Sequence, residues 1–269
     1  MTRPVLILGG TGEARAVAAA LDLAAIPVVS ALAGRVTRPR LPVGDVRIGG
    51  FGGPSGLSQW LIEHGIVAVV DATHPFAERI SASATAATAA AGVPLLRLER
   101  PGWTARAGDR WHWVDDIPAA AAAIRRLGAA RVFLTTGRQG LAEFAADRET
   151  WFLIRCVDPP SGELPPRRKV VLDRGPYTVA GELALLGRHR IDLLVTKDSG
   201  GPLTEAKLDA ARARHLPVLI VRRPQRQPAG AVAVAQTVTE AAAWAIAQCR
   251  PEPRPTGLEL SRPATASDA

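Results

Sequence analysis

Cysteine and aromatic residues are scarce in this chain of 269 residues. Its two cysteines, Cys156 and Cys249, have no metal-binding spacing and are too few for a disulfide framework. This scarcity excludes a disulfide-stapled fold and favours a location in the reducing cytoplasm. Because aromatic residues make up only 4% of the chain, we expect a core built mainly from Ala, Val, Leu and Ile.

Long apolar runs are absent as well. No segment approaches the length that crosses a membrane, so we expect no membrane partner. The first residues, Met1–Pro4, lead directly into a predicted strand, and we therefore expect no secretory signal. Hydrophobic residues nevertheless make up 47% of the chain, which is enough for one large domain or two smaller ones.

Basic residues outnumber acidic ones. The chain has 33 Lys and Arg against 25 Asp and Glu, which gives a net charge of +8 and a pI of about 10.8. The arginines are scattered through predicted loops and form no basic helix with interleaved aromatic residues, so we expect no nucleic-acid partner. A site for a small polyanion explains these loop arginines at least as well as a solvated basic surface does, and both interpretations remain open.

Short β-branched runs alternate with helical Ala/Leu runs along the first hundred residues. The predicted strands are Val5–Leu8, Pro27–Leu32, Asp45–Ile48, Val67–Asp71 and Pro94–Leu98, and the predicted helices are Glu13–Ala25, Ser55–His64 and Pro75–Ala91. After a break rich in Pro, Gly and Trp, the alternation resumes. The second half has predicted helices at 116–127, 141–146, 180–187, 205–215 and 239–249, and predicted strands at 131–135, 151–157, 191–196 and 217–221.

This alternation predicts an α/β fold of two Rossmann-like domains, each a doubly wound parallel sheet, with a cleft between them. We assign residues 1–100 to the first domain and residues 101–250 to the second. The remaining residues, 251–269, are rich in Pro, Arg, Ser and Thr, and we expect them to form a disordered tail.

The most informative motif is LGGTGEAR at residues 8–15, which follows an apolar strand and opens an Ala-rich helix. Glycines at such a turn let the backbone approach a pyrophosphate, and the helix N-terminus supplies free N–H groups. Arg15 stands where the G-x-G-x-x-G spacing has its third glycine, and a simple tight turn is the alternative interpretation. The predicted cofactor contacts here are Gly9, Gly10, Thr11, Gly12 and Glu13.

The second predicted strand ends where a dinucleotide-binding fold meets the adenosine ribose. Ser30 and Arg35 occupy this place, and no acidic residue does. A hydroxyl and a guanidinium suit a 2′-phosphate, so the sequence favours NADP over NAD. The alternative is that Arg35 faces only solvent.

Glycines also follow the third predicted strand, in the run at residues 49–53. There Gly50 lets the backbone approach a ligand, and the ring of Phe51 is available for stacking. A mobile surface loop is the alternative.

The fourth predicted strand is followed by Thr73, His74, Pro75 and Phe76. We expect Pro75 in the first turn of the next helix, with Thr73 or His74 near its N-cap. Thr73, Pro75 and Phe76 are predicted cofactor contacts. His74 is a proton donor, a cofactor contact or a structural cap.

Two strand ends of the second half carry similar polar turns. Their predicted substrate contacts are Thr136, Gly137, Arg138, Gln139, Lys197, Ser199, Gly200 and Gly201. Arg138 can hold a carboxylate, and Lys197 can bind a carboxylate or supply a proton. A salt bridge between Lys197 and Asp198, or another neighbour, is the alternative.

Together, these strand-end sequences resemble the precorrin-6A reductase family of cobalamin biosynthesis and its cobalt-precorrin-6A counterpart. The matching segments follow the family's order, and they are LGGTGEAR (8–15), ALAGRV (31–36), RIGGFGG (47–53), DATHPFA (71–77), LRLERPGW (96–103), LTTGRQ (134–139), VDPP (157–160) and TKDSGG (196–201). The resemblance implies an NADPH-dependent oxidoreductase that reduces a C=C bond of precorrin-6A, a polycarboxylated tetrapyrrole, to precorrin-6B. It implies neither a metal nor a flavin.

Within this resemblance, the first domain holds NADPH, the loops at 49–53 and 73–76 flank the nicotinamide, and the second domain holds the substrate carboxylates. Lys197, His74 and a bound water stay open as proton donors. Tyr177 stands where the family has Phe, and Asp198 stands where Asn is frequent, so we assume no essential role for either side chain.

Three alternatives compete with this function. A short-chain reductase or epimerase needs a Tyr-x-x-x-Lys pair, and the only tyrosine, Tyr177, is followed four residues later by Gly181. The same reduction of a cobalt-bearing substrate remains open, as does a non-catalytic NADP-binding sensor. We expect a monomer, because no long apolar stripe indicates an obligate dimer.

Overall fold

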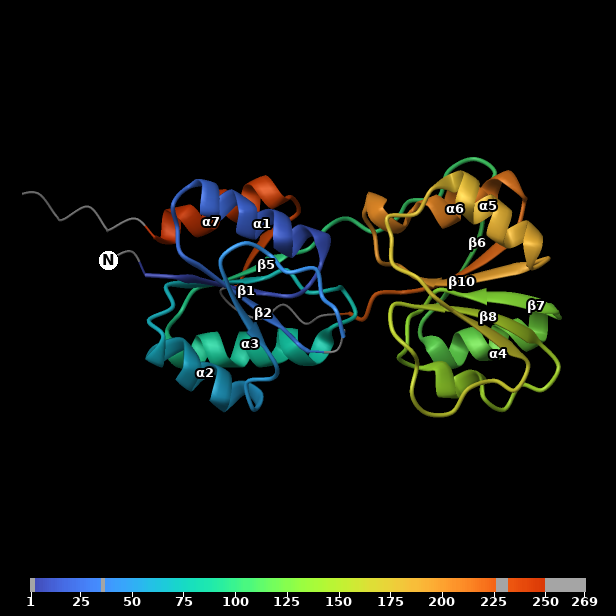
Figure 1. Ribbon diagram of the computed structural model, residues 1–269, viewed down its shortest axis with the longest axis horizontal. Coiled ribbons are helices and arrows are strands. Elements are labelled where there is room, and N and C mark those ends of the chain that lie inside the picture. Colours follow the sequence, from blue (N-terminus) through green and yellow to red (C-terminus); the bar gives the residue numbers. More distant parts are fainter. Residues whose placement is uncertain (1–2, 35–36, 226–231, 250–269) are drawn as a thin grey trace, which may run out of the picture.

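The computed structural model describes residues 3–34, 37–225 and 232–249. It consists of two α/β units, each built on a six-stranded parallel sheet with helices on both faces (Figure 1). The predicted fold class is thereby confirmed. In the described part of the chain, no helix is long and apolar enough to span a membrane.

The first unit has the strand order β12-β5-β4-β1-β2-β3. Its strands are β1 (Val5–Leu8), β2 (Val28–Leu32), β3 (Asp45–Ile48), β4 (Ala68–Asp71), β5 (Leu95–Leu98) and β12 (Ala233–Ala235), and its helices are α1 (Gly12–Leu23), α2 (Gly53–Glu63), α3 (Glu78–Ala91) and α7 (Val238–Gln248). The four residues of β1 are fully buried, as expected for a parallel strand covered on both faces.

The second unit has the strand order β6-β11-β10-β7-β8-β9. Its strands are β6 (Arg110–Val114), β7 (Arg131–Leu134), β8 (Trp151–Cys156), β9 (Arg168–Leu172), β10 (Leu193–Lys197) and β11 (Pro217–Val221). Its helices are α4 (Ile117–Leu127), α5 (Val179–Arg188) and α6 (Ala206–Ala213), with the 3₁₀ turns η1 (Leu141–Phe144) and η2 (Pro202–Thr204).

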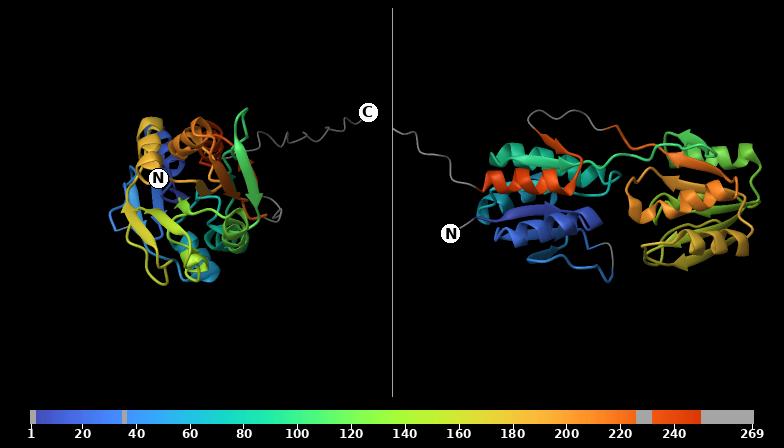
Figure 2. Two further views of the ribbon diagram at one scale, coloured as in Figure 1. Left: turned by 90° about the vertical axis from the view of Figure 1, so that its right-hand side faces the viewer. Right: turned by 90° about the horizontal axis from the view of Figure 1, so that it is seen from above.

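The two sheets share one strand order, and their outermost βα segments are exchanged. Strands β1 to β5 hold the same relative places as β7 to β11, and a sixth strand lies beside β5 or β11. The segment that follows β5, β6 with α4, lies on β11, whereas the segment that follows β11, β12 with α7, lies on β5 and against α1. The chain therefore crosses between the units twice, as Figure 2 shows in its view from above.

This exchange corrects the predicted domain boundary. Residues 101–250 were assigned to the second domain, but residues 233–248 complete the first one: Ala235 and Ala241 are buried in its core together with Val5. Local sequence does not reveal this, because a three-residue Ala-Val-Ala strand carries no information about which sheet it joins. The predicted tail, 251–269, lies outside the described residues.

Other elements also differ from the prediction. Residues 110–114, read as part of an inter-domain break, form the edge strand β6, and β9 and β12 were not predicted. The helix predicted at 141–146 is the short 3₁₀ turn η1, which Gly140 precedes with φ 81°. The helix predicted from Pro75 begins at Glu78 with Ala77 as its N-cap, so neither Thr73 nor His74 caps it.

Candidate active site between the two sheets

The carboxyl ends of the two sheets face each other. The backbone N–H of Thr37, after β2, donates to Asp158, after β8, over 3.1 Å. His74, after β4, hydrogen-bonds Ser199, after β10, over 3.0 Å. Open parallel sheets bind ligands beyond the carboxyl ends of their strands, so the facing edges form the candidate site.

The glycine turn after β1 forms a closely packed cradle. Gly9 has φ 120°, and a Cβ there would lie 2.8 Å from the carbonyl oxygen of Ala72, so only glycine fits. Thr11 is the N-cap of α1: its Oγ1 accepts the N–H of Ala14 over 3.0 Å and donates to Ala72 O over 2.8 Å. The turn thus places the start of α1 at the facing edge, as anion binding requires.

The remaining cradle residues are engaged by neighbours. Arg15 Nη1 donates to the carbonyl of Gly10 over 3.0 Å. Gly12 starts α1, and a Cβ there would come within 2.7 Å of Leu203 of the second unit. Glu13 forms an ion pair with Arg100 over 2.8 Å. Cofactor contacts of Gly9–Glu13 stay a prediction, but the carboxylate of Glu13 already has a partner.

Of the two residues predicted to contact the adenosine 2′-phosphate, the structure describes only Ser30. Ser30 lies inside β2 and is 1% exposed, and its Oγ has no hydrogen-bond partner among the described residues. Arg35 lies outside the described residues. Cofactor binding by both therefore stays a prediction, and a side chain as buried as Ser30 cannot be the main contact of a solvated phosphate.

The loop after β3 is packed onto α2. The ring of Phe51 makes an edge contact with Trp60 at 5.3 Å between centroids, and the guanidinium of Arg47 lies 4.6 Å from the Phe51 ring centroid. Gly50 is exposed, with open space where a Cβ would stand. Stacking of Phe51 on a cofactor stays a prediction, because the ring already packs within its own unit.

The turn after β4 is tied to the end of its own strand. Thr73 donates both its N–H and its hydroxyl to Asp71 Oδ1, the latter over 2.6 Å. Phe76 instead reaches across the interface and packs against the core of the second unit. Cofactor contacts of Thr73, Pro75 and Phe76 stay predictions. What the structure adds is that Phe76 joins the two units.

His74 is held as a neutral imidazole. Its Nδ1 accepts the backbone N–H of Phe76 over 3.3 Å, so Nε2 carries the proton and donates to Ser199 Oγ. Burial, and after it the nearby charges of Arg100 and Lys197, lower the pKa of His74 to about 3. A neutral imidazole that already donates its single proton is a poor general acid.

Lys197, at the end of β10, faces the first unit. Its Nζ lies 5.2 Å from the ring centroid of Phe76, and the ammonium makes no hydrogen bond or ion pair with any described residue. The salt bridge to Asp198 considered from the sequence is therefore not formed. Burial lowers the pKa of Lys197 below its usual range, which makes the ammonium a better proton donor at neutral pH.

The sequence did not identify the ion-paired network that holds the loop at 198–201. Arg100 donates from Nε to the carbonyl of Ser199 over 2.6 Å. Arg223, after β11, lies 3.2 Å from Asp198 Oδ2 and donates to the carbonyl of Arg100 over 2.7 Å. Two arginines at the ends of corresponding strands thus join both inter-unit connections to this loop.

The glycines of this loop serve its packing. Gly200 has φ 62°, and a Cβ there would lie only 2.2 Å from the carbonyl oxygen of Pro101. Gly201, with φ 74°, lies against Arg100. A substrate contact of Gly200, Gly201 or Ser199 stays a prediction. In the structure, these residues contact Pro101 and Arg100.

The turn after β7 is less tightly packed than the loop at 198–201. Thr136 is 5% exposed, and its Oγ1 has no hydrogen-bond partner among the described residues. A Cβ at Gly137 would meet nothing within 4 Å, and Gln139 is exposed. Arg138 Nη2 lies 4.0 Å from Asp158. The turn leaves space beside a basic side chain, and substrate binding by Thr136–Gln139 stays a prediction.

Known proteins match this chain along both units. A model of the family described as precorrin-6x reductase CbiJ/CobK matches residues 4–246. The precorrin-6A reductase of Rhodococcus erythropolis is 54% identical over 245 residues, which cover 91% of this chain and 97% of that protein. The solved structure of CobK precorrin-6A reductase has a TM-score of 0.85 and 43% identity, covering 91% of this chain and 97% of that one. A cobalt-precorrin-6A reductase of Salmonella typhimurium is 31% identical over 239 residues, covering 82% of this chain and 87% of that protein.

Proposed function

The chain belongs to the precorrin-6x reductase family, and on this basis we propose that it catalyses the NADPH-dependent reduction of precorrin-6A in cobalamin biosynthesis. The observation that carries the proposal is the family match along both units, including every strand end that meets at the interface. NADPH, when bound, supplies the hydride. The protein must hold the cofactor and the tetrapyrrole between the sheets and deliver a proton.

The first unit fits a dinucleotide. The turn at Gly9 brings the backbone to the start of α1, and Thr11 orders the helix N-terminus where a pyrophosphate binds. No acidic residue stands at the end of β2, where NAD-dependent folds hold the ribose hydroxyls. These features support NADPH as the cofactor.

The second unit supplies positive charge for a polycarboxylated substrate. Lys197 ends β10 and Arg138 follows the neighbouring strand β7, where Thr136 adds a buried hydroxyl in the same turn. We propose that these groups bind acetate and propionate groups of the tetrapyrrole, because charge-assisted bonds to carboxylates are the strongest available there.

Lys197 is the proposed proton donor. Its ammonium makes no hydrogen bond or ion pair with any described residue, it faces the other unit, and its lowered pKa suits proton release near neutral pH. His74 has a different role. By donating to Ser199 it keeps the loop after β10 against the first unit, and so it positions the neighbouring Lys197.

The metal-free substrate is preferred over the cobalt-bearing one. Identity is higher with relatives named for precorrin-6A than with those named for cobalt-precorrin-6A. The test is an anaerobic assay of the purified protein with both substrates, each with NADPH and with NADH. Reduction of precorrin-6A with a strong preference for NADPH is expected. Binding of NADPH without reduction of either substrate would contradict the proposal and favour the sensor.

A further inference from the structure

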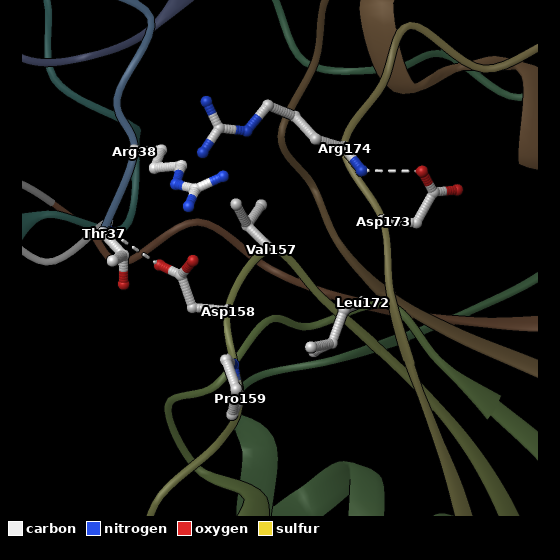
Figure 3. A pocket seen from close by; sticks show the side chains of 8 residues that line it. All are labelled: Thr37, Arg38, Val157, Asp158, Pro159, Leu172, Asp173 and Arg174. Carbon is white, nitrogen blue, oxygen red and sulfur yellow. Dashed lines mark hydrogen bonds between the residues drawn. The ribbon is translucent and has the colours of Figure 1, made fainter.

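One pocket at the unit interface is lined by arginines from both units. It has a volume of about 550 Å³ and lies between the connection after β2 and the segments that follow β8 and β9. Arg38 comes from the first of these and Arg174 from the last, and the two guanidinium groups extend over the same pocket in Figure 3.

Both carboxylates at this pocket already accept a hydrogen bond from the backbone. Asp158 accepts the backbone N–H of Thr37, and Asp173 accepts the backbone N–H of Arg174 (Figure 3). The guanidinium groups of Arg38 and Arg174 form no hydrogen bond or ion pair within the described ranges, and the same holds for Arg40. Their charge is therefore available to a ligand.

A fourth arginine lies at the cofactor cradle. Arg15, in the first turn of α1, donates to the carbonyl of Gly10 in the glycine turn. Burial, and then the charges of Arg40 and Arg174, lower the pKa of Arg15, with Glu13 opposing them in part. Like charges are thus held together beside a helix N-terminus, an arrangement that an anion with more than one negative charge would stabilise.

The position of the cluster indicates which anion it binds. In a fold of this kind the adenosine ribose lies at the end of the second strand, beside the connection that carries Arg38 and Arg40. We propose that Arg15, Arg38, Arg40 and Arg174 form one phosphate site shared by both units, which takes the 2′-phosphate of NADPH. This inference rests on the proposed function, because it assumes that NADPH is the cofactor. Its new element is Arg174, a residue of the other unit that makes cofactor selection depend on both units.

A substrate carboxylate shares this anion chemistry, so the experiment separates the two sources. Calorimetric titration of the full chain would measure the affinities of NADPH, NADH, adenosine 2′,5′-bisphosphate and adenosine 5′-monophosphate. The variants are Arg174→Gln and Arg40→Gln, with Arg126→Gln as the control. Arg126 is an exposed arginine in the last turn of α4, at the opposite edge of the second sheet.

We expect Arg174→Gln and Arg40→Gln each to weaken binding of NADPH and of the bisphosphate by about 10- to 100-fold, the loss typical of a hydrogen bond to a charged group. Affinity for NADH and for the monophosphate should stay within about twofold, since these ligands lack the 2′-phosphate. Arg126→Gln should match the wild type with every ligand, and Arg174→Lys should recover part of the NADPH affinity.

Two results would overturn the inference. One is unchanged NADPH affinity in Arg174→Gln; a weaker affinity of this variant for the tetrapyrrole in the same titration would then assign the site to substrate carboxylates. The other is equal affinity of the wild type for NADPH and NADH. Neither measurement requires turnover, so failure of the proposed reduction can be distinguished from failure of this site.

Discussion

Substitution of Gly9 by alanine separates backbone strain from steric overlap, because the chain contains a matched control. Gly9 and Gly49 have nearly the same φ, 120° and 118°, in a region that residues with a Cβ rarely adopt. A Cβ at Gly49 meets nothing within 4 Å, whereas at Gly9 it lies 2.8 Å from Ala72 O and 2.9 Å from Thr73 Cα. Both contacts are with backbone atoms, which cannot rotate away.

The expected losses follow from these two terms. Strain at a positive φ costs about 1–3 kcal/mol, so Gly49→Ala should lower the thermal midpoint by roughly 3–9 °C. Gly9→Ala adds an overlap of the kind that costs about 1–3 kcal/mol in a packed interior, so its midpoint should fall several degrees further. It also pushes against the carbonyl that accepts the hydroxyl of Thr11, and NADPH binding should be lost with the ordered helix start.

Calorimetry and fluorescence titration with NADPH, run on both variants, provide the test. The reasoning about the cradle is refuted if Gly9→Ala unfolds at the same temperature as Gly49→Ala, because the overlap would then have no cost. It is also refuted if Gly9→Ala binds NADPH as the wild type does.

Three further predictions concern the interface. Lys197→Met should lower kcat by about 100-fold or more. Lys197→Arg should restore the KM for the substrate but not kcat, since a guanidinium does not release a proton. Full recovery of kcat by Lys197→Arg in steady-state assays would show that Lys197 only binds a carboxylate. His74 binds a proton near pH 6.5 in the unfolded chain but only near pH 3 in the folded chain. Acidification from pH 7 to 5 should therefore lower the free energy of unfolding of the wild type by about 2 kcal/mol more than that of His74→Gln, as measured in denaturant titrations. Parallel pH profiles of the two proteins would contradict the low pKa. A double-mutant cycle of Glu13→Ala and Arg100→Ala should give a coupling energy of about 1 kcal/mol in the same titrations, and zero coupling would mean that this ion pair does not stabilise the fold.

The cradle after β1 could be predicted because its signals are local. An apolar strand, a glycine turn and Thr11 at the N-cap are read within ten residues, and each has the conformation that its residue type favours. The same holds for the parallel strands of both cores, whose β-branched runs are buried on both faces.

The role of His74 could not be predicted in this way. The sequence shows a histidine between Thr73 and Pro75 and allows a proton donor, a cofactor contact or a cap. The decision depends on Ser199, 125 residues away, and on the arginine and lysine charges that folding brings around the ring. Contacts of this kind are properties of the interface and of no local segment.

The sequence by itself determined the family, the α/β class, the glycine cradle and the candidate strand ends, because these are encoded in short segments whose conformation depends on neighbouring residues. Only the tertiary structure decided that β6 with α4 and β12 with α7 are exchanged between the units, and that Lys197 is left without a hydrogen bond or ion pair within the described residues. It also decided that Arg174 lines the same pocket as Arg38, which follows β2. The physical reason is that a parallel strand pairs with a partner far away in the chain, and the energies that select this partner come from burial and charge at the assembled interface.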